Sequence, residues 1–507
     1  MEYIGVKETA ISWGICQRRV QRLCEEKRVY GAKKIGNSWQ IPNGTLKPAD
    51  GRYKNLNDKK ELTSIDLFSG PGGLCTGFRW AGIHALIAVE WSDNTVQTYA
   101  HSHNAEIFEL EDYLNGTMSD PERYFQPSQR TLLIHGDIRK VTGDLIKKIL
   151  VTRFDRESVD IVTGGTPCES FSMAGDRKED DDRNILYKNV LRIARAVDSK
   201  MFLFENVKGL FSKKYDGKAG AMYRHICKEF QETDPKTGVT FKLAETDPHK
   251  VLLRAIEYGV PQNRERLFLV GVNARYPQGV FHYPEKTHGP GRKYPYVTVE
   301  DALMDLPALD SKEENNTYTF DIEQAKDTPA RYDYLQRMRG QCSMPPASSG
   351  FGKSSLSSHK APGHTERMLN RIKSIQPGES MKTAYERLLK EGKTDFVKAN
   401  FPKKIYAARN RRLKLGEPSF TVTSHCLDEM IHPTQDRGLT PRECARLQSF
   451  PDWYHFEGDY VTFHSDPEQD RYEQIGDAIP PLLGYVLGKE VARTLHSIKG
   501  NGKEKTK

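Results

Sequence analysis

The sequence predicts a doubly wound α/β fold, and three observations support this prediction. Short apolar runs without clean alternation recur between residues 64 and 272, as expected for strands of a parallel sheet that is buried on both faces. Helical stretches separate these runs. The first run leads directly into a glycine-rich turn, which is the connection that nucleotide-binding α/β sheets use.

The expected strands follow one another along the first half of the chain. They are residues 64–68, 85–90, 132–135, 159–163, 201–205 and 266–272. Residues 110–130 read as a polar insertion between two of them. From residue 276 to residue 418 the alternation disappears, and residues 345–360 are rich in Ser and Gly, which is typical of a loop.

Composition is that of a globular protein and excludes several other classes. The 507 residues allow two to four domains, and 37% of them are hydrophobic. No apolar run of about 18 residues and no secretory signal is present, so we expect no membrane association. The eight cysteines lack metal-type spacing, which predicts reduced thiols and no metal site. The net charge of +8 permits an acidic partner without establishing one.

Residues 1–50 are predicted to form a separate module. The expected elements are a short helix at 9–13, a second helix at 17–26 and a hairpin at 29–42. Val20, Leu23 and Cys24 would share the apolar face of the second helix. A polar, lysine-rich linker at residues 51–61 follows the module.

A glycine-rich turn at residues 66–73 could hold a nucleotide. Glycine lets the backbone turn tightly and approach a ligand closely. Glu90 ends the next expected strand, where an acid can bind ribose hydroxyls, and Asp137 ends a third strand, where it could accept from an adenine amino group. Taken alone, the glycine turn and Glu90 are a weak signal, because roughly half of such loops are an ordinary turn or a different nucleotide site.

Residues 163–172 follow a buried strand and contain one cysteine. Two glycines and a proline force a turn that would leave Cys168 at the carboxyl edge of the sheet, where ligands bind. This segment alone supports a nucleophile and an inert buried thiol equally. Glu205 follows four apolar residues, which is costly unless the carboxylate is paired or functional. Arg264 and Arg266 could form a surface pair or clamp a planar polar group.

Taken together and in order, these segments resemble the C5-cytosine methyltransferase family. The matching segments are 66–73 (DLFSGPGG), 164–168 (GGTPC), 205–207 (ENV), 262–266 (QNRER), 437–448 (RGLTPRECARLQ) and 476–481 (GDAIPP). One such motif would be weak evidence, but all of them in family order make a chance match implausible. The resemblance implies an S-adenosylmethionine-dependent methyltransferase that modifies carbon 5 of a cytosine flipped out of duplex DNA.

The resemblance also implies a role for each matching residue. Cys168 would be the nucleophile that adds to carbon 6, and Glu205 the acid that hydrogen-bonds the ring. Arg266, supported by Arg264, would contact the base carbonyl. The implied cofactor residues are Phe68, Gly70, Gly72, Glu90, Trp91, Asp137, Ile138 and Pro167. Glu169 and Asp477 stand where the family usually has Gln and Asn, which puts details of the site in doubt rather than its class.

The resemblance further divides the chain into parts. The implied parts are a catalytic domain at 62–275 and 419–490, an inserted basic target-recognition domain at 276–418 and a charged tail at 491–507. Thr440, Pro441 and Glu443 predict a helix that begins with a capping box. The N-terminal module resembles a winged helix-turn-helix of the MerR and excisionase type, with a small protein-interaction domain as the alternative.

We therefore expect double-stranded DNA as the partner, S-adenosylmethionine as the cofactor, and a monomer located in the cytoplasm and bound to the nucleoid. A cognate restriction endonuclease is a possible further partner. Three alternatives stay open: a tRNA cytosine-5 methyltransferase of the same fold, a DNA-binding regulator with a vestigial methylase domain, and a nicotinamide-dependent oxidoreductase. The large basic insert argues against the first, intact Cys168, Glu205 and Arg266 against the second, and the Pro167–Cys168 pair against the third.

Overall fold

The structure is a computed structural model with two compact units. It describes residues 3–13, 16–25, 29, 32–36, 38–42, 61–166, 185–340, 356–461 and 468–501. One unit comprises Met1–Asn55 with Ser348–Gly352, and the other comprises Leu56–Ala347 with Lys353–Lys507. Each unit encloses a hydrophobic core of its own.

The N-terminal unit is a small α/β module. Its elements are β1 (Tyr3–Gly5), α1 (Val6–Ser12), α2 (Gln17–Glu25), β2 (Lys33–Ile35) and β3 (Ser38–Pro42). The strands form an antiparallel sheet in the order β1-β3-β2. Val20, Leu23 and Cys24 are buried, so the predicted apolar face of the second helix is confirmed. The sequence did not predict β1, which pairs with β3 and closes the sheet.

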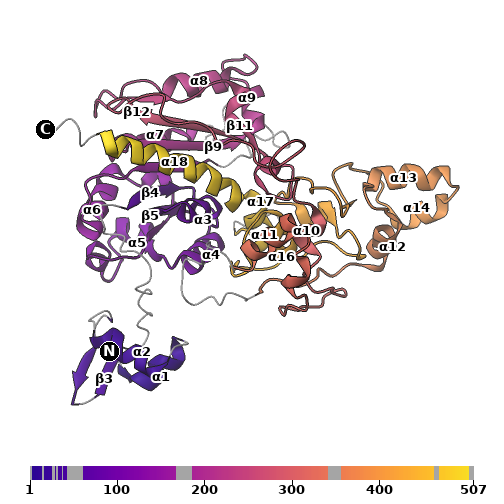
Figure 1. Cartoon of the computed structure of the whole chain (residues 1–507), viewed down its shortest axis with the longest axis horizontal. Helices are drawn as coiled ribbons and strands as arrows, with labels where there is room; N and C mark the ends of the chain where they lie inside the picture. The colour runs from indigo at the N-terminus through magenta and orange to yellow at the C-terminus, as the bar shows by residue number, and fades with distance from the viewer. Residues whose placement is uncertain are drawn as a thin grey trace. The chain divides into compact units, whose positions relative to one another are not determined.

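The large unit is built on a nine-stranded mixed sheet (Figure 1). The strands are β4 (Leu62–Leu67), β5 (Ile83–Glu90), β6 (Glu106–Glu109), β7 (Leu132–His135), β8 (Ile161–Gly165), β9 (Met201–Val207), β10 (Phe241–Leu243), β11 (Leu252–Arg254) and β12 (Glu265–Asn273). Their order is β10-β12-β9-β8-β4-β5-β7-β6, and β11 pairs with β12. All the expected strands are present.

The sheet was expected to be wholly parallel, and this is wrong for the strands at one edge of the sheet. Strands β4 to β9 pair in parallel, but β12 runs antiparallel to β9 and both β10 and β11 run antiparallel to β12. Antiparallel neighbours need no crossover helix, and their apolar runs look the same as parallel ones when both faces are buried. The antiparallel strand β12 brings its first residues beside the last residues of β9.

Helices cover both faces of the sheet (Figure 1). Residues of α3 (Gly73–Trp80) and α4 (Asp93–His103) share one core with β5 and β7. On the other face, α6 (Gly143–Phe154), α7 (Lys188–Ala196) and α8 (Ala221–Glu229) pack into the largest core. Shorter helical elements are α5 (Leu110–Asn115), η1 (Pro121–Phe125), η2 (Ile138–Lys140), η4 (Lys208–Ser212), α9 (Pro248–Val251) and η5 (Ala255–Tyr258). None of the helices described combines the length and apolarity that a bilayer crossing requires.

The last described helix, α18 (Pro481–Asn501), packs along α3 (Figure 1). Glycine makes this close approach possible, because a Cβ on Gly77 would lie 2.4 Å from the carbonyl oxygen of Pro481. The charged tail was expected to begin at residue 491, and this boundary is wrong. Val491, Leu495 and Ile498 are buried at helical spacing, so the helix continues well beyond that residue.

The regular elements between residues 276 and 440 are mainly helices joined by irregular segments, and the predicted loss of the α/β alternation is confirmed. Its elements are α10 (Val299–Leu303), η6 (Ile322–Ala325), α11 (Pro329–Met338), α12 (Glu366–Ser374), α13 (Met381–Lys390), α14 (Thr394–Asn400), β13 (Arg411–Arg412), α15 (Cys426–Glu429) and β14 (Met430–Ile431). Helices α12 to α14 enclose a separate core around Ile372, Leu388 and Val397. The whole region belongs to the same compact unit as the sheet, so a separate domain at 276–418 stays a prediction.

Buried charges join this helical region to α16 (Pro441–Leu447), which α17 (Arg471–Asp477) follows. Arg446 is fully buried and pairs with Asp305 at 2.9 Å and Asp452 at 2.5 Å. Arg339 of α11 also pairs with Asp305, at 2.7 Å. The predicted capping box of Thr440 with Glu443 is confirmed at the start of α16. Removing one partner from such a network would leave an uncompensated buried charge, so it fixes how these elements meet.

Candidate active site

The loop after β4 is bent by three residues with left-handed backbone. Phe68, Gly70 and Gly72 have φ angles of 52°, 53° and 97°. Phe68 is strained in this region, because only glycine adopts it without cost. The bend turns the amide of Gly70 toward β5, and its N–H donates to Glu90 Oε2 at 2.8 Å. The loop is therefore folded around the carboxylate at the end of the neighbouring strand.

Main-chain amides hold Glu90. Its Oε1 accepts from the N–H groups of Trp91 at 2.8 Å and Ser92 at 3.2 Å. Burial raises the pKa of Glu90, although these three amide donors oppose the shift. The side chain of Trp91 leaves this well-packed strand end with a relative exposure of 69%, which is unusual for a tryptophan. The solvent-exposed ring of Trp91 therefore follows directly after the carboxylate of Glu90, which main-chain amides hold in place.

Asp137 and Ile138 follow β7, the next strand along the edge. Asp137 accepts from the backbone N–H of Arg139 at 2.9 Å and from its guanidinium. Burial would raise the pKa of Asp137, but these Arg139 hydrogen bonds outweigh it and hold the pKa below its usual value. Ile138 is buried. Both residues stand where the sequence expects them, one strand away from Glu90.

Residues far along the chain support the glycine loop from behind. The Tyr454 hydroxyl donates to the Pro71 carbonyl, and His103 Nε2 lies 3.0 Å from the same hydroxyl oxygen. Burial lowers the pKa of His103 to about 3, so the ring is neutral. A Cβ on Gly72 would lie 2.4 Å from His103 Nε2. Tyr454 and His103 belong to no sequence motif, so the sequence alone did not indicate them.

Two buried polar atoms of the loop fit a zwitterionic ligand. Among the described residues, Asp66 Oδ2 and Ser69 Oγ have no hydrogen-bond partner. The other oxygen of Asp66 accepts from Thr163 Oγ1 at 2.8 Å. A Cβ on Gly70 would meet nothing within 4 Å, so the loop is open on that side. These residues fit the methionine part of S-adenosylmethionine, which carries both an ammonium and a carboxylate group.

A second group of side chains gathers where β8, β9 and β12 meet. Glu205 on β9 is aligned with Gly165 on β8 and with Phe268 on β12. Its Oε1 accepts from Arg266 Nε at 2.9 Å. A Cβ on Gly165 would lie 2.5 Å from Glu205 Oε2, so only glycine leaves room for the carboxylate. Burial raises the pKa of Glu205, and the positive charges of Arg266 and Arg264 oppose that shift.

Arg264 and Arg266 differ in what their guanidinium groups contact. Arg266 pairs with Glu205, whereas the fully buried Arg264 donates to the carbonyl oxygens of Val422 at 2.6 Å and Gly476 at 2.8 Å. Gln262 contributes a similar link, since its Oε1 accepts from the Val422 N–H at 2.9 Å. The structure thus makes Arg264 a positioning residue that joins β12 to the closing part of the chain, rather than a group at the base.

The remaining predicted residues complete this picture. Pro167, Cys168 and Glu169 lie outside the described residues; β8 itself ends at Gly165. Asp477 Oδ2 accepts from Gln469 Nε2 at 2.9 Å. Since β4 and β8 are adjacent and parallel, the glycine loop and the Glu205 group share the carboxyl edge of the sheet, where ligands bind in such folds.

The fold and its polar carboxyl edge define an α/β methyltransferase. Residues 62–120 and 126–493 match the family described as C-5 cytosine-specific DNA methylase, and the chain belongs to that family. It is a DNA (cytosine-5-)-methyltransferase, and enzymes of this family use S-adenosyl-L-methionine. The oxidoreductase interpretation of the glycine loop and the tRNA alternative are therefore set aside.

Several proteins that are similar to this chain are named as type II methyltransferases. M.DdeI of Desulfomicrobium norvegicum is 29% identical over 435 residues, covering 85% of this chain and 88% of its own. M.Eco47II of Escherichia coli is 28% identical over 505 residues, covering 98% and 95%. A crystal structure of an E. coli prophage protein described as a DNA modification methyltransferase aligns with a TM-score of 0.56 at 23% identity, over 87% of this chain and 99% of that one. This last likeness shows the fold.

Proposed function

We propose that this enzyme is the modification methyltransferase of a type II restriction-modification system and methylates cytosine within one duplex sequence. The names of its relatives support the biological role. The observation that carries the site assignment is the Glu205–Arg266 pair, whose ion pair measures 2.9 Å and which stands next to the strand that leads to Cys168. A cognate endonuclease would cut the same sequence when it is unmethylated.

The proposed roles at the base follow from the chemistry of cytosine. The Cys168 thiolate adds to carbon 6, which makes carbon 5 nucleophilic. Burial raises the pKa of Glu205, which favours the protonated form that can donate to ring N3 as charge develops. Arg266 holds the Glu205 carboxyl and donates to the base carbonyl. S-adenosylmethionine supplies the methyl group, and loss of the proton from carbon 5 then releases Cys168.

The proposed cofactor site uses the other half of the edge. Phe68, Gly70 and Gly72 would surround the methionine part, where Asp66 and Ser69 offer buried polar atoms. Glu90 would accept from the ribose hydroxyls, and the exposed ring of Trp91 would pack on the adenine. The residues proposed for the adenine edge and the sulfur are Asp137, Ile138 and Pro167.

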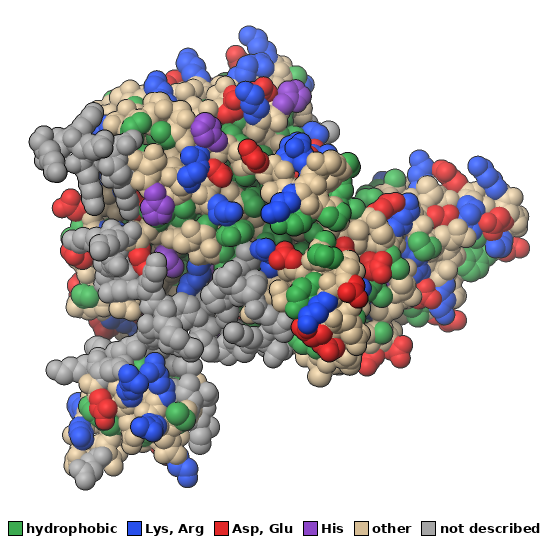
Figure 2. All heavy atoms as spheres, viewed as in Figure 1, with side chains coloured by type: hydrophobic (Ala, Val, Ile, Leu, Met, Phe, Trp, Pro, Cys, Tyr) green, Lys and Arg blue, Asp and Glu red, His purple; other side chains and the backbone are tan. Residues whose placement is uncertain are grey.

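Residues 276–418 are the proposed target-recognition region. The lobe of α12 to α14 has a separate hydrophobic core, so its surface residues are free to vary without loss of the fold. Lys and Arg are interspersed there with Asp and Glu on the face shown in Figure 2. Individual side chains, rather than uniform positive charge, would then read the bases, while other basic residues contact phosphates.

Sequencing of bisulfite-treated DNA tests the proposed function. Host DNA with the gene should carry 5-methylcytosine at every copy of one short sequence, and DNA from a strain without the gene should lack it there. The same DNA should resist an endonuclease that cuts this sequence. If the methylated cytosines shared no common sequence, or if 5-methylcytosine were found only in tRNA, the proposal would be contradicted.

We also propose that the N-terminal unit is a winged helix-turn-helix that binds DNA. Helix α2 turns Val20 and Leu23 inward and leaves Arg18 and Arg22 at the surface, as a recognition helix would. A protein that begins near residue 54 should still methylate its target. The isolated unit should bind duplex DNA with an affinity that falls steeply with salt, because arginine–phosphate contacts release counterions. Failure of the isolated unit to retain DNA, with loss of methylation by the truncated enzyme, would favour a structural role.

A further inference from the structure

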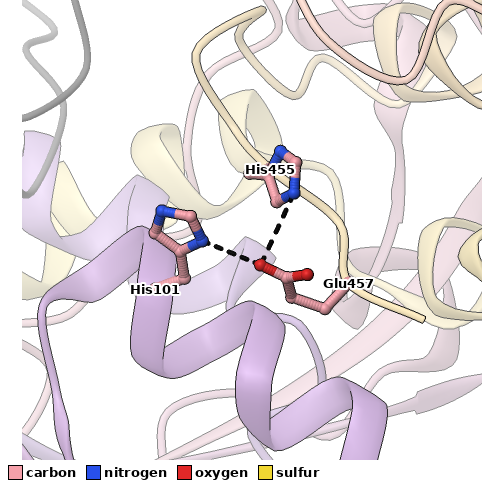
Figure 3. A group of neighbouring side chains, drawn as sticks. All are labelled: His101, His455 and Glu457. Atoms are coloured by element: carbon pink, nitrogen blue, oxygen red, sulfur yellow. Dashed lines mark hydrogen bonds and ion pairs between the residues drawn. The ribbon is translucent and has the colours of Figure 1, made fainter.

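Two histidines and a glutamate meet outside the proposed active site (Figure 3). His101 lies on α4, and His455 and Glu457 lie on the segment that follows α16. His101 Nδ1 is 2.9 Å from Glu457 Oε1, and His455 Nε2 is 3.5 Å from the same oxygen. Figure 3 shows the carboxylate between the two rings, with one nitrogen of each ring directed at it. None of the three residues belongs to the proposed active site or to the proposed target-recognition region at 276–418.

The spacing of these atoms suits a tetrahedral metal ion. Zinc binds imidazole nitrogen and carboxylate oxygen at about 2.0–2.1 Å, which separates neighbouring ligand atoms by roughly 3.3 Å. The two measured separations of 2.9 and 3.5 Å bracket that value, and all three ligand atoms lie within 4.8 Å of one another. The side chains are between 31% and 46% exposed, so small rotations can bring the two nitrogens closer.

Hydrogen bonds hold the two backbone segments together on either side of the cluster. Ser102 Oγ on α4 donates to the carbonyl oxygen of His455 at 3.3 Å. The N–H of Glu457 donates to Thr98 Oγ1, also on α4, at 2.8 Å. The backbone of all three ligands is thus fixed before any ion arrives, which reduces the entropy that binding would cost.

Charge around the cluster is compatible with a cation. Glu457 contributes one negative charge, which offsets part of the repulsion from two nearby guanidinium groups that donate to backbone carbonyl oxygens. Arg442 donates to the carbonyl oxygens of Pro451 and Tyr454, and Arg471 donates to that of Gly458. Two imidazoles and a carboxylate, with the fourth position open to water, form a ligand set typical of zinc and related ions.

We propose that His101, His455 and Glu457 bind a divalent transition-metal cation of the zinc class. The ion would join α4 to the segment that carries Tyr454, the residue that supports the glycine loop through Pro71. His103, two residues after His101, contacts the same tyrosine at 3.0 Å. The site would therefore stabilise the rear wall of the cofactor loop without touching the cofactor.

Binding of Zn²⁺ to the metal-free full-length enzyme tests this site. Titration in competition with a chromophoric chelator gives the affinity, and Co²⁺ absorption reports tetrahedral nitrogen and oxygen ligands. The variants His101→Ala and Glu457→Gln each remove one ligand. His225→Ala is the matched control, because His225 also faces a glutamate, Glu229 at 3.4 Å, without a second histidine.

The wild type and His225→Ala should bind Zn²⁺ equally and should unfold at a higher temperature with the ion than without it. Each ligand variant should bind at least about tenfold more weakly and lose the tetrahedral Co²⁺ spectrum. Because all three side chains are partly exposed, the variants should keep the circular dichroism of the wild type. Equal Zn²⁺ affinity in all four proteins, or no binding by the wild type, would overturn the proposal.

Discussion

The two halves of the carboxyl edge are built in different ways. On the half proposed for the cofactor, the backbone sets the geometry: left-handed glycines bend the loop, and main-chain amides hold Glu90. On the half proposed for the target base, side chains set the geometry: Arg266 holds the carboxylate of Glu205, and Gly165 on the neighbouring strand leaves room for it. Substitutions on the first half should therefore affect binding and stability, and those on the second should affect rate.

The largest effect is expected for Cys168→Ser, which should abolish methyl transfer and leave DNA binding largely intact. A hydroxyl is a far poorer nucleophile than a thiolate at neutral pH. A duplex that contains 5-fluorocytosine should trap a covalent complex with the wild type alone. Methylation by the serine variant at a rate near that of the wild type would show that another group attacks the base.

Glu205→Gln should lower the methylation rate by about 10²- to 10⁴-fold, because the substitution keeps the shape of the side chain and removes its proton. Affinity for S-adenosylhomocysteine, measured by calorimetry, should change little. Glu265→Gln is the matched control, since that neighbouring carboxylate pairs with Lys208 at the surface. A large loss of cofactor affinity in Glu205→Gln would move this residue to the cofactor half.

Alanine substitutions of two glycines in the loop should distinguish an effect on the free energy of unfolding from an effect on cofactor affinity. Gly72→Ala should lower the free energy of unfolding by about 2–4 kcal/mol, since its Cβ would collide with His103 and would also strain the backbone. Gly70→Ala has a similar φ penalty but meets open space, so it should cost about 1 kcal/mol of stability and weaken cofactor binding instead. Urea unfolding and calorimetry measure the two quantities. Equal loss of stability in both variants would argue against this division.

The last prediction concerns pH. Burial raises the pKa of Asp66 from 3.8 to about 7, so the folded protein keeps a proton that the unfolded chain has lost. The stabilising contribution of Asp66 is therefore complete below pH 3.8 and is lost as the pH rises toward about 7. Urea unfolding should show that the wild type loses stability relative to Asp66→Asn across this range. A difference that does not vary with pH would mean that Asp66 ionises normally.

How far the sequence predicts this molecule depends on whether a residue acts through its neighbours in the chain. The strands, the capping box of Thr440 and the position of Glu205 at the end of an apolar strand follow from local patterns. The reversal of β12 does not, because apolar runs carry no direction. Nor does the bracing role of Arg264, which depends on carbonyl groups more than 150 residues away.

The close packing of α3 against α18 has a consequence for the synthesis of the enzyme. Helix α3 directly follows the glycine loop, yet the surface around its Gly77 is covered only when residues 481–501 have left the ribosome. Domains usually fold as units during translation. The packing of α3 is therefore completed only by a helix that lies far along the chain. A fragment that stops before residue 481 would leave this face of α3 uncovered, and we expect it to lose the support behind the glycine loop.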